Sequence, residues 1–181
     1  MNLPNKVTLV RIFLVPLITG FLISPSPVSS FIAACIFSLA SFTDWLDGHL
    51  ARQREETTLL GKLLDPIADK LLITSALIPL VALDRAPAWM VVIIIGREFA
   101  VTGLRAVIAA KSVIIAASPL GKYKMISEIV AVLFLILDWK TSLIDLNALG
   151  FLALWVAMIL GLTSAIDYFT KFLSHVDLDL E

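Results

Sequence analysis

The chain has 181 residues, of which 59% are hydrophobic and 16% are charged, and its mean hydropathy is +0.96. Soluble domains usually carry about 45–50% apolar and about 25% charged residues, so this composition argues against a soluble protein and predicts a single integral membrane domain over residues 1–181. The formal net charge of −1 argues against a nucleic-acid-binding protein, which would present a basic surface.

Six membrane helices are predicted along the chain. Residues 12–42 carry no charge, but the sequence Ser-Pro-Ser-Pro at 24–27 is typical of a turn and divides this run in two. Cys35, the single cysteine, is expected as a small core residue of the second helix. A bilayer is crossed by about 20 helical residues, and runs of that length predict an all-α integral membrane fold. The predicted helices cover roughly 7–24, 29–52, 62–83, 87–110, 122–138 and 146–170.

The basic residues indicate how these helices are oriented. With six spans, the N-terminus, the second and fourth connections and the C-terminus lie on one side of the membrane. Of the 14 Lys and Arg residues, all but Arg85 and Lys140 fall on or toward that side. Because cytoplasmic loops carry an excess of Lys and Arg, we expect the N-terminus to be cytoplasmic.

Several charged residues fall inside the predicted spans. Residues 71–83 are too few to cross a bilayer alone, so the third helix must extend back through charged positions. A carboxylate in hydrocarbon costs at least about 2.5–3.5 kcal/mol on insertion scales. Because these charges lie toward the cytoplasmic ends of the helices, they predict one polar cavity that opens to the cytoplasm. They are Asp44, Asp47, Asp65, Asp69, Lys70, Arg97, Glu98 and Glu128.

Four aspartates follow helical spacing on two neighbouring helices. Asp44 and Asp47 share one face of the second helix, and Asp65 and Asp69 stack on one face of the third. A hairpin between the helices would bring the four carboxylates together, where their mutual repulsion requires compensation. Hard divalent cations with oxygen ligands supply it, which favours Mg²⁺ or Mn²⁺.

Residues around the aspartates are suited to a phosphate-bearing ligand. Gly48 and Ala51 are small where a bulky group must approach the helix backbone. Arg52, one turn beyond Gly48, can pair with a phosphate. Residues 44–69 follow the pattern D-x-x-D-G-x-x-A-R-x₈-G-x-x-x-D-x-x-x-D. With every fixed position matched, this segment resembles the signature of the CDP-alcohol phosphatidyltransferase family.

That resemblance implies an enzyme that transfers the phosphatidyl group of CDP-diacylglycerol to an alcohol. It also implies six transmembrane helices, usually in a homodimer, around a cytoplasm-facing cavity with two metal ions. Asp44, Asp47 and Asp65 would be metal ligands, and Asp69 would be both a ligand and the base for the acceptor hydroxyl. The CDP moiety would be held by Gly48, Arg52, Thr58 and Gly61. Apart from the resemblance, Asn5, Thr8 and Arg11 at the start of the first helix are candidates to face the nucleotide from below.

Basic residues outside the aspartate signature indicate the chemistry of the acceptor. Arg97, Arg105, Lys122 and Lys124 cluster in the fourth helix and around the fourth connection. Several fixed cations suit an alcohol that bears a phosphate, whereas choline or ethanolamine would require an aromatic or anionic pocket. Positive-inside anchoring is an open alternative for Lys111 and Lys124. Glu98, next to Arg97, is a candidate ion-pair partner for it.

Four short motifs look like those of bacterial phosphatidylglycerophosphate synthases, a branch of the family. This similarity implies sn-glycerol-3-phosphate as the acceptor, phosphatidylglycerophosphate and CMP as the products, and the bacterial inner membrane as the location. Met125 and Glu128 depart from the threonine and glutamine that are usual there. The motifs are residues 3–11, Gly96-Arg97-Glu98, Gly103-Leu104-Arg105 and Gly121-Lys122-Tyr123-Lys124.

Two alternatives stay open at this point. Another acceptor, such as inositol phosphate, serine or phosphatidylglycerol, would keep the family and change the product. A small cation or proton transporter would also carry carboxylates within the membrane. Transporters more often place such groups near the midplane on broken helices or inverted repeats. Here the carboxylates gather at one side and no repeat is visible, which favours the enzyme.

Overall fold

The computed structural model describes the backbone of residues 3–54, 59–110 and 119–176. Side chains are described for these residues except at 3–7, 44–54, 59–63, 65, 109–110, 119 and 174–176. Over this part of the chain the structure is all-helical, apart from one isolated bridge between Lys140 and Asp145. The helices are α1 (Leu3–Ile23), α2 (Pro27–Arg54), α3 (Leu59–Ala82), α4 (Ala88–Ala110), α5 (Pro119–Leu137) and α6 (Leu146–Val176).

Two helix starts follow from capping residues in the sequence. Ser26 precedes Pro27, and its hydroxyl accepts a hydrogen bond from the amide of Ser29 at 3.1 Å. Proline suits the first position of a helix because its missing N–H has no partner there. Asp145 caps α6 in the same way, since its carboxylate accepts a bond from the amide of Ala148 at 3.1 Å. The turn predicted at 24–27 is therefore confirmed.

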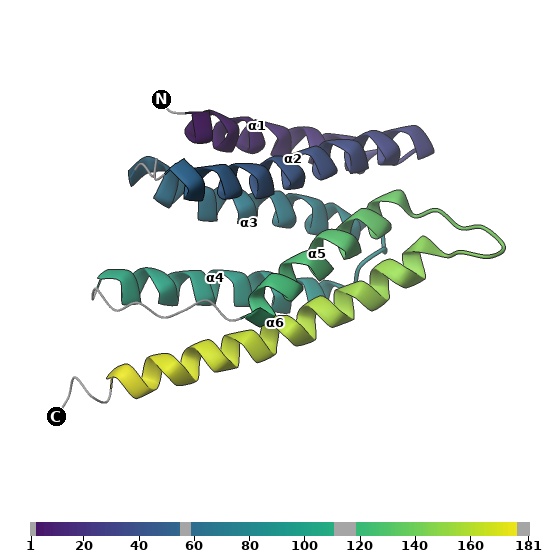
Figure 1. The fold of residues 1–181 in the computed structure, drawn as a ribbon. Helices are drawn as coiled ribbons and strands as arrows, with labels where there is room; N and C mark the ends of the chain where they lie inside the picture. Colours follow the sequence, from purple (N-terminus) through teal and green to yellow (C-terminus); the bar gives the residue numbers. More distant parts are fainter. Residues whose placement is uncertain (1–2, 55–58, 111–118, 177–181) are drawn as a thin grey trace.

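The α3–α4 connection is a tight helix stop. Asp84 has φ 56°, and the amide of Arg85 donates to the carbonyl of Leu80 at 2.9 Å, which is the pattern of a Schellman motif. The Arg85 guanidinium then reaches the end of α5. It donates to the carbonyl of Ile136 at 2.9 Å and pairs with Asp138 at 3.0 Å. This arginine joins the α3–α4 and α5–α6 connections, which both lie opposite the chain termini (Figure 1).

The core is built where the six helices meet in the half of the molecule near these connections. Fully buried Phe37, Leu72, Met90, Leu135 and Leu154 come from α2 to α6. Helices α1, α2 and α3 form one group in Figure 1, and α5 and α6 cross beneath them as a closely packed pair. A second, small apolar cluster joins α4 to α6 nearer the termini, through Val101, Ile108, Ala165 and Tyr168.

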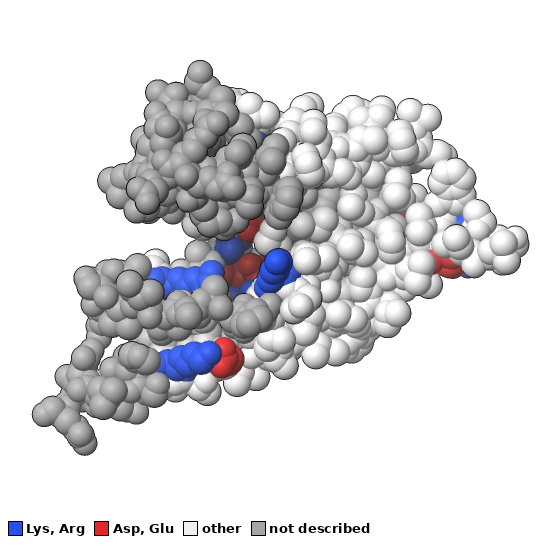
Figure 2. All heavy atoms as spheres, in the orientation of Figure 1, with Lys and Arg blue, Asp and Glu red and all other residues white. Residues whose placement is uncertain are grey.

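The outer surface of the helices is strongly apolar. Figure 2 shows charged side chains toward both ends of the visible face, separated by a broad uncharged band. By length and composition alone, the described residues contain one helix suited to cross a membrane, Leu146–Leu173. Large exposed hydrophobic side chains nevertheless occur on every helix; among them are Phe13, Phe31, Ile78, Val92, Ile126 and Leu152.

Six helices within a few residues of the predicted bounds confirm the all-α prediction. The expectation for Cys35 is wrong, because this side chain is exposed. It lies on the outward face of α2, beside exposed Phe31 and Leu39, whereas Ala33, Ala34 and Phe37 face the core. An uninterrupted apolar run gives no periodicity that would separate these two faces.

Candidate active site

The aspartates of the sequence signature lie on two helix ends that are joined by residues 55–58. Asp44 and Asp47 are in the last three turns of α2, and Asp65 and Asp69 are in the first three turns of α3. Asp44 and Asp47 are three residues apart and Asp65 and Asp69 are four apart. In a helix, either spacing puts both members of a pair on one face. The side chains of Asp44, Asp47 and Asp65 lie outside the described residues.

Asp69 is the signature aspartate whose side chain is described. It is partly buried, and it lies within electrostatic reach of Glu128 on α5. The described residues contain no group of three or more His, Cys, Asp or Glu side chains arranged to hold a metal ion. The predicted ligand set draws three of its four members from side chains beyond that description, so it stays a prediction.

Most of the residues predicted to hold CDP also have side chains that lie outside the described residues. Gly48 and Arg52 belong to the end of α2 and Gly61 to the start of α3, where the structure describes the backbone only. Thr58 and the side chain of Asn5 lie outside the described residues. Thr8 is described and is buried in α1.

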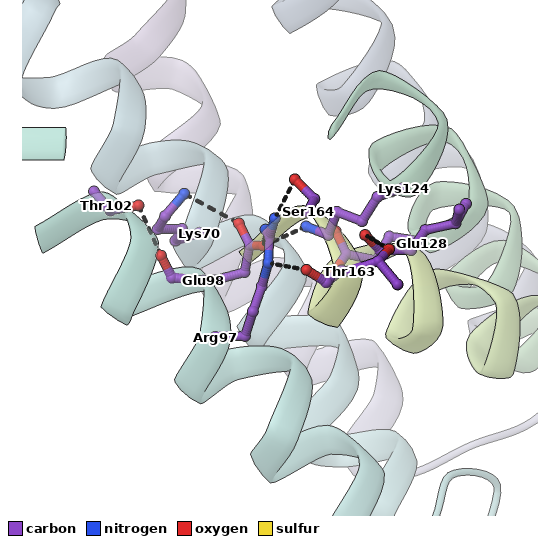
Figure 3. A network of polar contacts seen from close by, with 10 residues as sticks. Lys70, Arg97, Glu98, Thr102, Lys124, Glu128, Thr163 and Ser164 are labelled. Atoms are coloured by element: carbon purple, nitrogen blue, oxygen red, sulfur yellow. Dashed lines mark hydrogen bonds and ion pairs between the residues drawn. The ribbon is translucent and has the colours of Figure 1, made fainter. Parts of the chain in front are cut away.

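Five charged side chains from α3, α4 and α5 form one network, which we name the ion cluster (Figure 3). Glu98 is at its centre and pairs with Arg97, with Lys70 at 3.3 Å and with Lys124 at 2.5 Å. The Lys124 ammonium also pairs with Glu128 at 2.5 Å, one turn further along α5. The structure therefore brings together charges that the sequence placed on three separate spans.

Arg97 extends the ion cluster to α6. Its Nε donates to the carbonyl of Gly161 at 2.9 Å and its second terminal nitrogen donates to the hydroxyl of Ser164 at 3.1 Å. With the Glu98 pair, each of the three guanidinium nitrogens has a protein partner. Removing either member of a buried pair leaves the other charge uncompensated, so such contacts hold the helices in a specific arrangement.

The other two predicted acceptor-phosphate residues lie apart from the ion cluster. Arg105 is two turns beyond Arg97 on α4, is exposed, and stacks over the Tyr168 ring of α6 with its guanidinium carbon 5.1 Å from the ring centre. Lys122 is exposed near the start of α5. The four predicted cations thus comprise two buried and ion-paired side chains and two exposed ones.

Sequence reasoning did not assign roles to Lys70, Gly161, Ser164 or Tyr168, and it offered Glu98 only as an ion-pair partner of Arg97, a pair that the structure confirms. For Lys70 and Glu98 a signal existed, because both are charges within apolar runs and each needs a partner. For Ser164 and Tyr168 no signal was available, since small polar residues and tyrosines occur throughout helices. Their contribution depends on how α6 crosses α4, which is a tertiary property.

The chain is similar in sequence to known proteins over most of its length. The family described as CDP-alcohol phosphatidyltransferase matches residues 1–163. A Bacillus subtilis protein named CDP-diacylglycerol–glycerol-3-phosphate 3-phosphatidyltransferase is 45% identical over 94% of this chain and 94% of its own length. Proteins of the same name from Rickettsia bellii and Shigella flexneri are 38% and 34% identical, over 93% and 92% of both chains respectively.

Proposed function

Because the chain belongs to the CDP-alcohol phosphatidyltransferase family, we propose that it transfers the phosphatidyl group of CDP-diacylglycerol to sn-glycerol-3-phosphate, giving phosphatidylglycerophosphate and CMP. The observation that carries this proposal is the match, over almost the full length of both chains, to relatives named for that reaction. The complete aspartate signature on adjoining helix ends supports it independently.

The signature aspartates are suited to hold two divalent cations, Mg²⁺ or Mn²⁺. The donor set of Asp44, Asp47, Asp65 and Asp69 offers only carboxylate oxygens, the ligands that these hard cations prefer. The α2 and α3 helices place both pairs at one end of the molecule, which fits a shared site. When bound, two such ions stabilise the negative charge that develops on the attacking and leaving oxygens.

Asp69 is proposed as the base of the reaction. The acceptor hydroxyl oxygen forms a bond to the phosphorus of the phosphatidyl group, the bond from that phosphorus to the CMP oxygen breaks, and the hydroxyl proton passes to the Asp69 carboxylate. A carboxylate is a weak base toward an alcohol, so this transfer depends on close positioning. Gly48, Arg52, Thr58 and Gly61, with Asn5 and Thr8, would hold the departing CMP moiety.

The acceptor phosphate would meet the basic side chains of α4 and α5. Exposed Arg105 and Lys122 are accessible to an incoming anion, and the Tyr168 ring under Arg105 restricts the guanidinium plane. Arg97 and Lys124 lie deeper and add positive charge behind them. Guanidinium binds phosphate through two parallel hydrogen bonds, which supports an acceptor that carries a phosphate.

We place all six helices across a bacterial inner membrane, as a homodimer, with both termini and the site facing the cytoplasm. The uncharged band between two charged ends and the exposed apolar side chains of each helix support the membrane placement, whereas the homodimer is proposed from the family resemblance. In Figure 1 both termini lie at one end of the molecule, opposite the α5–α6 connection, as an even number of spans requires. The basic residues favour the cytoplasm for that end.

The decisive experiment follows CMP release by the purified chain in detergent. The protein receives CDP-diacylglycerol, Mg²⁺ or Mn²⁺, and a panel of alcohols: sn-glycerol-3-phosphate, inositol phosphate, serine and phosphatidylglycerol. Release with sn-glycerol-3-phosphate is expected. Release only with another alcohol would keep the family chemistry and overturn the acceptor. No release with any alcohol would overturn the proposed reaction.

A further inference from the structure

Glu98 connects more charged groups than any other residue of the ion cluster. One carboxylate oxygen is 3.3 Å from the Lys70 ammonium of α3, and the other accepts from Arg97 of α4 and from Lys124 of α5. Figure 3 shows Glu98 between these basic side chains, with Arg97 continuing toward α6. A single carboxylate therefore ties α3 and α5 to α4, and through Arg97 also to α6.

Loss of these contacts would destabilise the fold, because Glu98 is largely buried. Its side chain is 16% exposed, and the helix positions around it belong to the main core on one side, at Ile94, and to the small α4–α6 cluster on the other, at Val101. Three cations face two carboxylates in the ion cluster, a formal excess of one positive charge. Without Glu98 that excess would rise, and the cations would repel one another in a poorly solvated place.

Two of these contacts involve residues that lie next to or within the proposed active site, Lys70 and Lys124. Lys70 follows Asp69 on α3, so the Lys70–Glu98 pair fixes the rotation of the helical turn that carries Asp69. Lys124 is held between Glu98 and Glu128, so its ammonium occupies one defined place beside the acceptor cations. Glu98 therefore links the turn of α3 that carries Asp69 to the basic side chains of α4 and α5.

We propose that Glu98 is a positioning residue that holds Arg97 and Lys124, the basic side chains behind the proposed acceptor site, in register with the Asp69 turn of α3. This role rests on the proposed function, because it specifies how that site is held together. Glu98 acts through its basic partners, and the structure shows it bonded to them rather than directed at a reacting group.

The test compares Glu98→Gln with Glu98→Asp in the full chain. Glutamine keeps the shape and removes the charge, so KM for sn-glycerol-3-phosphate should rise about tenfold or more, the loss of roughly one charged hydrogen bond. KM for CDP-diacylglycerol should stay within about twofold, since the described partners of the ion cluster lie on α3 to α6 and include none of the residues proposed to hold CDP. Aspartate keeps the charge, so its acceptor KM should fall between those of Glu98→Gln and the wild type.

Binding gives a readout that is separate from turnover. sn-Glycerol-3-phosphate should raise the melting temperature of the wild type and of Glu98→Asp, and should raise that of Glu98→Gln much less. Asp167→Asn is the matched control, because it neutralises a carboxylate in an exposed ion pair with Lys171 on α6. This control should keep the wild-type KM for both substrates.

The outcomes separate the positioning role from the reaction itself. If Glu98→Gln does not fold, Glu98→Asp decides, and it must raise the acceptor KM without raising the CDP-diacylglycerol KM. An unchanged acceptor KM, or an equal rise in both KM values, overturns the positioning role. A wild type that releases no CMP with any acceptor overturns the proposed function instead.

Discussion

Asp69 has two proposed roles, as a metal ligand and as a base. Its side chain is partly buried and lies within electrostatic reach of Glu128. Lys70, the next residue, is engaged by Glu98, so it contributes positive charge nearby through a fixed geometry.

Asp69→Asn should lower kcat by about 10²–10⁴-fold, the usual contribution of a general base. Asparagine has nearly the same volume, so the melting temperature should change little. CMP release under saturating sn-glycerol-3-phosphate measures the effect. Asp145→Asn, at the opposite end of the molecule, is a control that should keep full activity. Full activity of Asp69→Asn would remove this residue from the reaction.

Arg105 is proposed to bind the phosphate of the acceptor. Arg105→Lys keeps the positive charge but loses the planar group that stacks on Tyr168 and that can bind phosphate through two bonds. KM for sn-glycerol-3-phosphate should rise about tenfold, roughly the value of one charged hydrogen bond. Tyr168→Phe should be nearly neutral, because phenylalanine retains the ring face. An unchanged KM in Arg105→Lys would assign the acceptor phosphate to other cations.

What the sequence could predict differs between the two groups of charged residues. The aspartates follow a fixed spacing within 26 positions of the chain (44–69), so their helices and their shared faces were predictable from helical periodicity. The ion cluster joins residues from position 70 to position 128, and no spacing rule relates its members on different helices. Which cation meets which carboxylate depends on how the helices cross, and this only the folded structure shows.

At the scale of helices, Gly150 permits the closest approach among the six glycines whose surroundings the structure describes, and this approach is between α5 and α6. A Cβ atom on Gly150 would lie 2.9 Å from Cγ of Leu135 and 3.1 Å from its backbone nitrogen. Leu135 is fully buried, so its side chain has little room to move. The α5–α6 pair is tight at this point because residue 150 has no side chain.

Gly150→Ala should therefore destabilise the fold by about 1–3 kcal/mol, the usual cost of overpacking. Gly20→Ala on α1 is the matched control, since no atom lies within 4 Å of its added Cβ. That substitution should be neutral or stabilising by about 0.5–1 kcal/mol, because alanine favours helix more than glycine. Thermal unfolding of both variants in detergent measures the difference. Equal melting temperatures would show that α5 and α6 can separate without cost.

Helix bounds were predictable to within a few residues because they are set by local chemistry. Ser26-Pro27 and Asp145 begin helices through caps, and the Asp84–Pro87 segment ends one helix and begins the next. The faces of the helices were harder to predict. Cys35 lies in a run that is apolar on all sides, and only the packing of α1, α3 and α5 around α2 shows that it points outward.

At the scale of the whole molecule, two connections are braced at the end opposite the termini. Arg85 binds the end of α5 and Asp138, while Lys140 pairs with Asp145 across the α5–α6 connection at 2.9 Å. These are the two basic residues that the charge distribution assigned to the far side of the membrane. Only these two of the 14 basic residues fall on that side, so this end does little to oppose the orientation set by the other twelve.

The proposed orientation predicts which ends of the molecule a membrane-impermeant thiol reagent reaches. In a Cys35→Ser background, Leu143→Cys places a thiol on the α5–α6 connection at a position that is 94% exposed. Lys171→Cys places one near the other end of α6, where the lysine side chain is 49% exposed. In intact spheroplasts the reagent should label residue 143 and leave residue 171 unlabelled, and both should react after permeabilisation.

Because α6 is long and apolar enough to cross a bilayer, the two thiols should lie on opposite sides. Labelling of residue 171 alone in intact cells would invert the orientation, and equal labelling of both would show that α6 does not span the membrane.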